Sequence, residues 1–149
     1  MATKAAATLQ PALESLSTAR IQLRPPIPIE NGPFGSRYVF EVASAKFEGR
    51  VAGELEGVAC ADWLLVDSDG AATLDIRGTL RTPDGAIIYL NYYGKCDMSG
   101  GMNFPVTIYV APRFETSHPD YKWLNKILAV GKGVVDENLS LEYEWFEMK

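Results

Sequence analysis

The sequence predicts an all-β protein: a single antiparallel calycin/lipocalin-like barrel of about eight or nine strands, with one short helix. Short stretches that alternate apolar and polar residues recur along most of the 149-residue chain. Turn residues, mainly Gly, Pro, Asn and Asp, separate these stretches. The connections are mostly short, which favours neighbouring strands that run up and down over a Greek-key sandwich.

The clearest pattern is at residues 73–93, which we interpret as a hairpin. Thr82-Pro83-Asp84-Gly85 fits a type I turn that ends on a Gly with positive φ. If Gly85 forms a bulge, Thr82 lies opposite Ala86. The next pairs are then Arg81 with Ile87, Thr79 with Tyr89, Arg77 with Asn91 and Asp75 with Tyr93.

This register gives the hairpin one apolar and one polar face, and two uses of the faces stay open. The apolar face can pack a core while the polar face meets water, which is common in antiparallel sheets. Alternatively, the sheet closes into a barrel whose interior holds the polar face around a ligand. The side chains of the polar face are Asp75, Arg77, Tyr89, Asn91 and Tyr93.

The other elements follow in chain order. Residues 1–17 are predicted to be a flexible leader, and residues 18–149 to be the barrel domain. Residues 94–103 are rich in glycine and are expected to form a mobile loop, a possible lid. One helix is expected at 120–126, and Gly131 and Gly133 are expected to break a short strand. Further strands are expected at 18–24, 37–43, 47–55, 63–66, 104–114 and 139–148.

Composition excludes several kinds of partner. The net charge of −5 and the pI near 4.9 argue against nucleic acid or an anionic membrane, because no basic patch could bind phosphates. No apolar run reaches the roughly 18 residues of a membrane span. The first residues do not form a secretory signal, so a cytoplasmic location is expected. No nucleotide-binding motif is present, and no cofactor is expected.

The few residues that commonly carry metal or nucleophile chemistry give weak signals. Cys60 and Cys96 have no CxxC spacing, so inert thiols are favoured over a disulfide, and no metal site is expected. His118 is the one histidine of the chain and precedes Pro119 in an expected loop. A catalytic triad or a histidine metal site would depend on that residue alone.

Several phrases, in this order, resemble the family of small β-barrel proteins catalogued as domain of unknown function 3237. The resemblance covers about residues 20–143. One departure is Val58-Ala59-Cys60, where a glycine-rich turn would be expected. The phrases are Gly32-Pro33-Phe34-Gly35-Ser36-Arg37, Phe47-Glu48-Gly49, Asp62-Trp63-Leu64-Leu65-Val66, Asp69-Gly70, residues 74–82, residues 84–89, Pro112-Arg113-Phe114-Glu115-Thr116 and Trp123-Leu124-Asn125.

The resemblance implies a calycin-like barrel, often assembled into homo-oligomers, with small organic molecules as substrates and no agreed activity. It favours the arrangement in which the polar hairpin face lines the interior. The family's motif positions carry over as Arg37, Asp62, Trp63, Asp75, Arg77, Tyr89, Phe114, Glu115 and Trp123.

The functional hypothesis is a cofactor-independent cyclase or isomerase that acts on a small, secondary-metabolite-like molecule. Asp75 would be the acid or base, while Arg37 or Arg77 would stabilise an enolate or oxyanion. A carrier or sensor that uses the same interior, and a structural subunit with a filled core, are the alternatives. The expected substrate-binding residues are Trp63, Tyr89, Asn91, Tyr93, Tyr109, Glu115, Trp123 and Tyr143.

Overall fold

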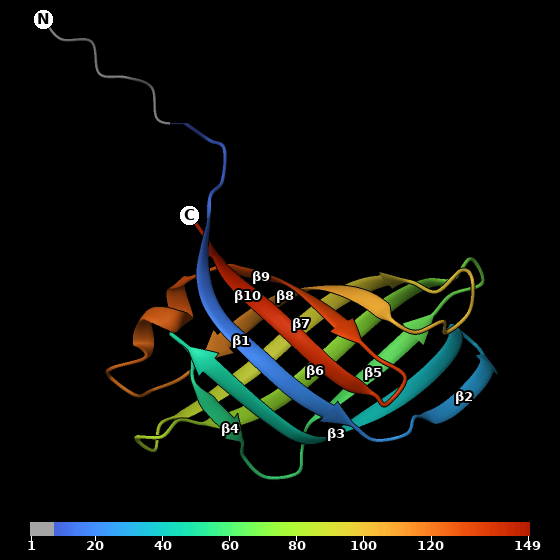
Figure 1. Ribbon diagram of the computed structural model, residues 1–149, viewed down its shortest axis with the longest axis horizontal. Coiled ribbons are helices and arrows are strands. Elements are labelled where there is room, and N and C mark those ends of the chain that lie inside the picture. The colour runs from blue at the N-terminus through green and yellow to red at the C-terminus, as the bar shows by residue number, and fades with distance from the viewer. Residues whose placement is uncertain (1–7) are drawn as a thin grey trace, which may run out of the picture.

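The computed structural model describes residues 8–149, which form one antiparallel sheet and a short 3-10 helix (Figure 1). The strands are β1 (Leu13–Leu23), β2 (Ile27–Gly32), β3 (Gly35–Gly49), β4 (Gly53–Leu55), β5 (Ala61–Val66), β6 (Ala71–Arg81), β7 (Ile87–Asp97), β8 (Val106–Glu115), β9 (Ala129–Val135) and β10 (Ser140–Met148), and the helix is η1 (Lys122–Lys126).

The sheet closes on itself because β1 pairs with both β10 and β3. β2 continues the position of β1 beside β3, and β4 and β5 share the position between β3 and β6. The result is an eight-position closed antiparallel barrel with one short helix, which confirms the predicted fold class. Within residues 8–149, no helix is long and apolar enough to cross a membrane.

The central hairpin has the register that its turn residues predict. Arg81 pairs with Ile87, and the pairing continues without a shift to Ala71 and Asp97. Gly85 takes a φ of 88°, and the Thr82 backbone N–H donates to the Ala86 carbonyl at 2.9 Å. The type I turn with a bulged glycine therefore fixes which residues of β6 and β7 face each other.

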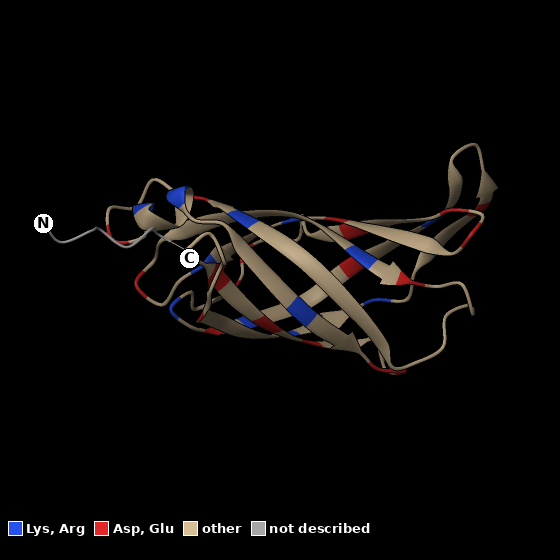
Figure 2. Cartoon of the chain, turned by 90° about the horizontal axis from the view of Figure 1, so that it is seen from above, with Lys and Arg blue, Asp and Glu red and all other residues tan. Residues whose placement is uncertain are grey.

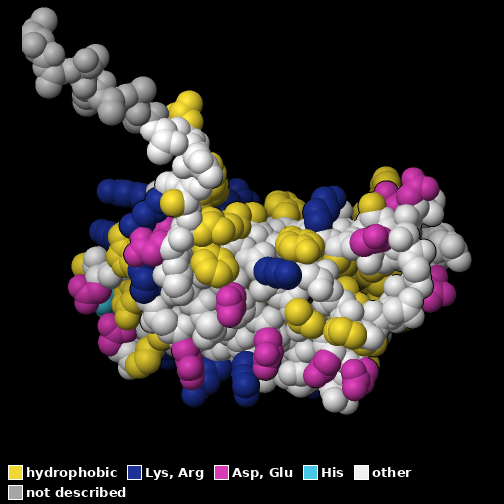
Figure 3. Space-filling view, turned by 45° about the horizontal axis from the view of Figure 1, so that its top comes forward, with side chains coloured by type: hydrophobic (Ala, Val, Ile, Leu, Met, Phe, Trp, Pro, Cys, Tyr) yellow, Lys and Arg dark blue, Asp and Glu magenta, His cyan; other side chains and the backbone are white. Residues whose placement is uncertain are grey.

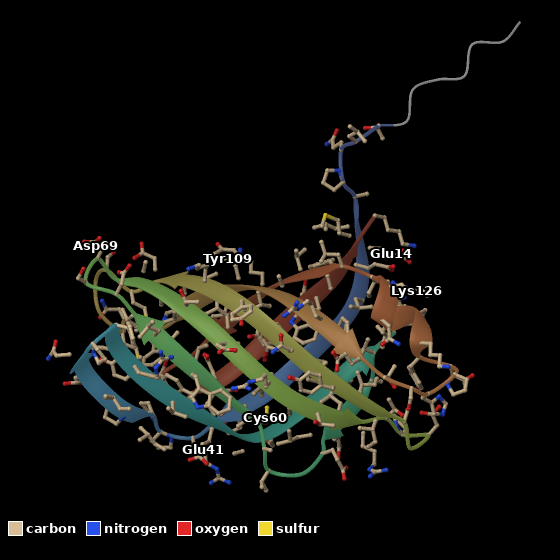
Figure 4. All side chains as sticks on the ribbon, turned by 180° about the vertical axis from the view of Figure 1, so that it is seen from behind. Glu14, Glu41, Cys60, Asp69, Tyr109 and Lys126 are labelled. Carbon is tan, nitrogen blue, oxygen red and sulfur yellow. The ribbon has the colours of Figure 1, made fainter. Side chains whose placement is uncertain are left out.

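The apolar face of this hairpin points into the barrel. Leu80 is 1% exposed and Ile88 is fully buried. The polar face lies on the outer wall, where side chains line the outside of β6 and β7 (Figure 4). The expectation that Asp75 and Arg77 point into the interior is therefore wrong. Burying both charges without partners would cost more free energy than leaving them in water.

The interior is filled at one end and hollow at the other. Trp145 is 1% exposed and packs against Phe47, Tyr92, Phe114 and Tyr143, with ring centroids 4.9 to 5.9 Å apart. The helix η1 lies beside this filled end and inserts Leu124, which is also 1% exposed. The segment 98–105 reaches over the hollow end and contributes Met98, Met102 and Phe104 to its lining.

Several predicted boundaries are wrong. The expected strands 37–43 and 47–55 both overlap the continuous strand β3, and the first residues of the expected loop 94–103 belong to β7. β1 begins at Leu13, so residues 13–17 belong to the barrel and not to a leader, while residues 1–7 lie outside the described part. β9 runs through Gly131 and Gly133 without a break, since both its neighbours pair with it there. Charged residues of both signs are distributed along the strands and loops (Figure 2). On the face drawn in Figure 3, apolar side chains lie between charged ones of both signs.

Candidate ligand site in the barrel interior

A hollow of about 80 Å³ lies inside the barrel and is lined almost wholly by apolar side chains. Strands β1 and β3 to β10 contribute to its wall, together with the segment 98–105. No Lys, Arg or His among residues 8–149 lines this hollow. Its ionisable side chains are Asp62, Cys60, Cys96, Tyr92 and Tyr143.

Asp62 faces inward because of its place in the sheet. It pairs with Phe40 on β3 and with Ile76 on β6, and residues directly opposite each other in a sheet share a face. Phe40 and Ile76 are each 6% exposed and belong to the core. Asp62 keeps partial exposure and borders the hollow. A single carboxyl is therefore held in an apolar wall.

The surroundings of Asp62 favour its protonated form. Burial raises the pKa of Asp62 from 3.8 to about 7, the hydrogen bond from the Asp75 backbone N–H opposes that rise, and the nearby Asp75 carboxylate adds to it. The N–H of Asp75 donates to Oδ1 of Asp62 at 3.0 Å. No hydrogen bond to Oδ2 of Asp62 occurs among the described residues. At neutral pH this carboxyl can therefore both give and take a proton.

Two tyrosines form a second polar group in the hollow. The hydroxyl groups of Tyr92 and Tyr143 are 3.5 Å apart, and each side chain is 3% exposed. Burial raises the pKa of both phenols well above the usual value, so both keep their protons at neutral pH. Tyr92 donates to Tyr143, which leaves the Tyr143 O–H without an acceptor among residues 8–149. A buried hydroxyl donor is thus free to bind a ligand oxygen.

The sheet sets the spacing between the carboxyl and the phenols. Ile76 pairs with Asp62 on one side and with Tyr92 on the other, so all three face inward in one row. Two strand spacings separate the backbones of Asp62 and Tyr92, which amounts to about 10 Å. The carboxyl of Asp62 and the hydroxyl of Tyr92 therefore border the same hollow from two strands that flank β6.

Glycines on β9 make room for the aromatic rings. A Cβ atom at Gly133 would lie 2.6 Å from Cδ1 of Tyr143, and one at Gly131 would lie 2.4 Å from Cδ1 of Trp145. Any side chain at these two positions would push the rings out of place. The glycines therefore seat Tyr143 and Trp145 against the strand.

The cysteines are unpaired thiols, as the sequence favours. Burial raises the pKa of Cys60 to about 11, and burial also raises that of Cys96 to about 11. Cys60 packs against Gly78, whereas Cys96 pairs with Ala72. Six residues along a strand span about 20 Å, so these thiols are too far apart for a disulfide.

Among the site residues predicted from sequence, Tyr143 lines the hollow and the other ten do not. The guanidinium of Arg77 lies 4.8 Å from the centre of the Trp63 ring on the outer wall. Arg37 bonds the Trp63 carbonyl. The interior orientation expected of these residues is wrong, and their roles in chemistry stay predictions. The ten are Arg37, Trp63, Asp75, Arg77, Tyr89, Asn91, Tyr93, Tyr109, Glu115 and Trp123.

Sequence reasoning missed Asp62 and Tyr92 as interior functional groups. Tyr92 belongs to the apolar face of the hairpin. Its hydroxyl could have indicated that this face brings one polar atom into the interior. Asp62 is a family motif position, but its inward orientation follows from pairing with β3 and β6. Such pairing between distant segments has no local signature in the sequence.

A cluster of possible metal ligands lies outside the barrel. Single ligand atoms of Asp84, His118 and Asp120 lie within 4.8 Å of one another at the surface. Hydrogen bonds already engage two of these groups: the Tyr121 hydroxyl donates to Asp84 at 2.9 Å, and the Asp120 N–H donates to Nδ1 of His118 at 3.2 Å. The bond between Tyr121 and Asp84 joins the hairpin turn to the segment before η1. These three side chains therefore form a contact between two loops.

Comparison with known proteins identifies the family of this chain. The family described as "Protein of unknown function (DUF3237)" matches residues 11–148. The chain belongs to this family. A UPF0311 protein of Rhodopseudomonas palustris is 32% identical over 82 residues, which cover 48% of this chain and 54% of that protein. The matched part of this chain thus spans about half the length of the curated relatives it matches.

Solved structures share the barrel over nearly the whole chain. A beta-barrel like protein from Acinetobacter baumannii has a TM-score of 0.82 and 30% identity, and the match covers 96% of this chain and 99% of that one. A protein of unknown function from Clostridium acetobutylicum has a TM-score of 0.85 and 23% identity, over 94% and 100% of the chains. An enzyme from Penicillium herquei has a TM-score of 0.71 and 21% identity, over 98% and 100%.

Proposed function

We propose that this family member binds a small, neutral, mostly apolar carbonyl compound in the barrel interior and moves a proton on the carbon next to its carbonyl. The reaction class is a cofactor-independent isomerisation or cyclisation through an enolate. The observation that carries this proposal is the single carboxyl of Asp62, with a pKa of about 7, in a wall that is otherwise nearly apolar. A carboxyl with this environment is suited to general acid–base catalysis near neutral pH.

Each group has a defined role in the proton transfer. The ionised Asp62 removes a proton from the carbon beside the carbonyl, and the electron pair of that C–H bond forms the enolate C=C bond. The Tyr143 hydroxyl donates a hydrogen bond to the enolate oxygen, and the Tyr92 hydroxyl supports Tyr143 at 3.5 Å. Asp62 then returns its proton to a different carbon, so no oxidant or cofactor is needed.

The lining determines the class of ligand. Without a cation on its wall, the hollow has no partner for a ligand carboxylate, and burying such a charge would be costly. Its 80 Å³ is smaller than a cavity of about 150 Å³ that holds a benzene ring. Met98 and Met102 have flexible side chains and can move to enlarge the space. A ligand of one ring with one carbonyl is therefore the largest that we expect, and it requires these methionine side chains to move.

The enzyme from Penicillium herquei supports the proposal at the level of the fold, because its name shows that a barrel of this shape can belong to an enzyme. A carrier of small apolar molecules is the second candidate. It is favoured by the almost wholly apolar wall, which would hold a ligand without chemistry. Binding without turnover in every assay below would select the carrier.

The test is the isomerisation of cyclohex-3-enone to cyclohex-2-enone, followed by the ultraviolet absorbance of the conjugated product. Wild-type protein should accelerate this reaction in proportion to its concentration. Asp62→Asn should lower the rate by about a hundredfold or more, as expected for loss of a general base. Glu144→Gln, which removes an exposed carboxyl from the outer wall of β10, is the control.

Two results would overturn the assignment. One is a rate that Asp62→Asn leaves at the wild-type level. The other is a rate that depends on Asp75 and not on Asp62, which would return the chemistry to the outer wall. Deuterium uptake by the ketone in D₂O, measured by NMR, provides a second readout of the same proton transfer.

A further inference from the structure

The pairing of β5 with β6 is interrupted beside Asp62. Ala61 and Asp62 pair with Arg77 and Ile76, and Leu65 and Val66 pair with Thr73 and Ala72, in the same register on both sides. Trp63 and Leu64 between them have no pairing partner on β6. On its other edge, β5 pairs with β3 without a break. β5 therefore follows β3 and separates locally from β6.

Two side chains bond backbone groups at this interruption. From the inner side, Oδ1 of Asp62 accepts the backbone N–H of Asp75 at 3.0 Å. On the outer side, Nη1 of Arg37 donates to the backbone carbonyl of Trp63 at 3.0 Å. Arg37 pairs with Leu65, which lies three residues after Asp62 on β5. Because side chains alternate along a strand, Leu65 and Arg37 face outward where Asp62 faces inward. The guanidinium and the carboxyl thus act on the same gap from opposite faces of the sheet.

We propose that Arg37 is a positioning residue for Asp62: its guanidinium holds the Trp63 carbonyl at the interruption and keeps β5 and β6 far enough apart for the Asp62 carboxyl to reach the Asp75 N–H. The consequence for catalysis rests on the proposed function, whereas the hydrogen-bond geometry does not. Arg37 acts from outside the barrel and touches no ligand.

The other outer arginines do not act on this gap. Arg77 lies over the Trp63 ring and bonds no backbone group at the interruption. Arg113 donates from Nη2 to Oδ1 of Asn91 at 2.7 Å, so its partner is a side chain on β7. Arg113 is therefore a matched control, an outer-wall arginine with one hydrogen bond that does not concern the β5–β6 pairing.

The ionisable groups near Asp62 make the hydrogen bond from the Asp75 N–H decisive for the pKa of Asp62. Asp75 lies on β6, Tyr92 on β7, Cys96 near the end of β7, and Tyr143 on β10. None of them is a cation that could stabilise the Asp62 carboxylate. The hydrogen bond from Asp75 is the contribution that lowers the pKa of Asp62. Loss of this bond should therefore raise that pKa further.

The experiment measures the carboxyl pKa of Asp62 by ¹³C NMR in wild type, Arg37→Met and Arg113→Met, with the Asp62 signal assigned through Asp62→Asn. Arg37→Met should raise the pKa by about one to two units, the usual weight of a hydrogen bond to a charged group. Arg113→Met should leave it at the wild-type value. Arg37→Lys retains a donor and should restore most of the wild-type pKa.

The outcomes separate this inference from the proposed function. An unchanged Asp62 pKa in Arg37→Met, or an equal rise in Arg113→Met, would overturn the positioning role and leave the proposed function standing. A wild-type pKa near 4 would contradict the proposed function, while a rise in Arg37→Met would still support the positioning role. If Arg37→Met does not fold, Arg37→Gln compared with Arg37→Lys gives the same test.

Discussion

Replacing Asp62 with Asn should stabilise the protein relative to wild type by an amount that grows as the pH rises from about 4 to about 8. Burial raises the pKa of Asp62 from 3.8 in the unfolded chain to about 7 in the folded protein. Between these values the folded state holds a proton that the unfolded state has released. The stability that Asp62 contributes is therefore fully present below pH 3.8 and is lost as the pH rises through about 7.

The difference between a pKa of 3.8 and a pKa of about 7 corresponds to about 4 kcal/mol of unfolding free energy. The asparagine side chain of the variant does not titrate, so the difference in stability between variant and wild type should change by up to about this amount over the range. Urea denaturation at half-unit pH steps, followed by tryptophan fluorescence, measures it. The same measurement on Glu144→Gln, which removes an exposed carboxyl of β10, is the control. A difference in stability between Asp62→Asn and wild type that does not change with pH would refute the burial of the Asp62 carboxyl.

Three further predictions concern residues around the site. Gly133→Ala should destabilise the protein by about 1 to 3 kcal/mol, because the added Cβ would lie 2.6 Å from Tyr143, and thermal denaturation should show no such loss for Gly100→Ala, which has space. Thr82→Val should cost about 1 to 3 kcal/mol in urea denaturation, because Thr82 Oγ1 accepts the buried Ala86 N–H at 2.8 Å. A loss equal to that of Thr79→Val, at a half-buried threonine of β6, would contradict this reason. Cys60 and Cys96 should react with a disulfide reagent at pH 8 far more slowly than free cysteine, because burial raises the pKa of each to about 11, and fast labelling of the folded protein would contradict this.

The hairpin could be predicted residue by residue because its determinants are local. Pro83 and Gly85 set the turn, and alternation on both strands then fixes the register. The barrel followed from the spacing of strands and the family resemblance. The glycines of β9 misled the prediction, because a residue that weakens an isolated strand is needed where the rings of Tyr143 and Trp145 press against the sheet.

The site could not be predicted in the same way. The polar face of the hairpin looked like a binding site because it gathers acid, guanidinium and phenol groups, but desolvation keeps Asp75 and Arg77 outside. Asp62 bonds the N–H of a residue 13 positions later in the chain. The burial of the Asp62 carboxyl depends on strands that meet only in the closed barrel. No short segment of the sequence therefore predicts that Asp62 faces the interior.

The location of a bound ligand tests the central claim most directly. 4-Bromophenol resembles the enolate of a ring ketone, and the anomalous scattering of its bromine marks its position in a crystal structure. We predict that the molecule lies inside the barrel, with its oxygen within hydrogen-bond distance of the Tyr143 hydroxyl and its ring between Tyr143 and Asp62. Bromine on the outer wall beside Trp63 and Arg77, with an unoccupied interior at saturating concentration, would contradict the account.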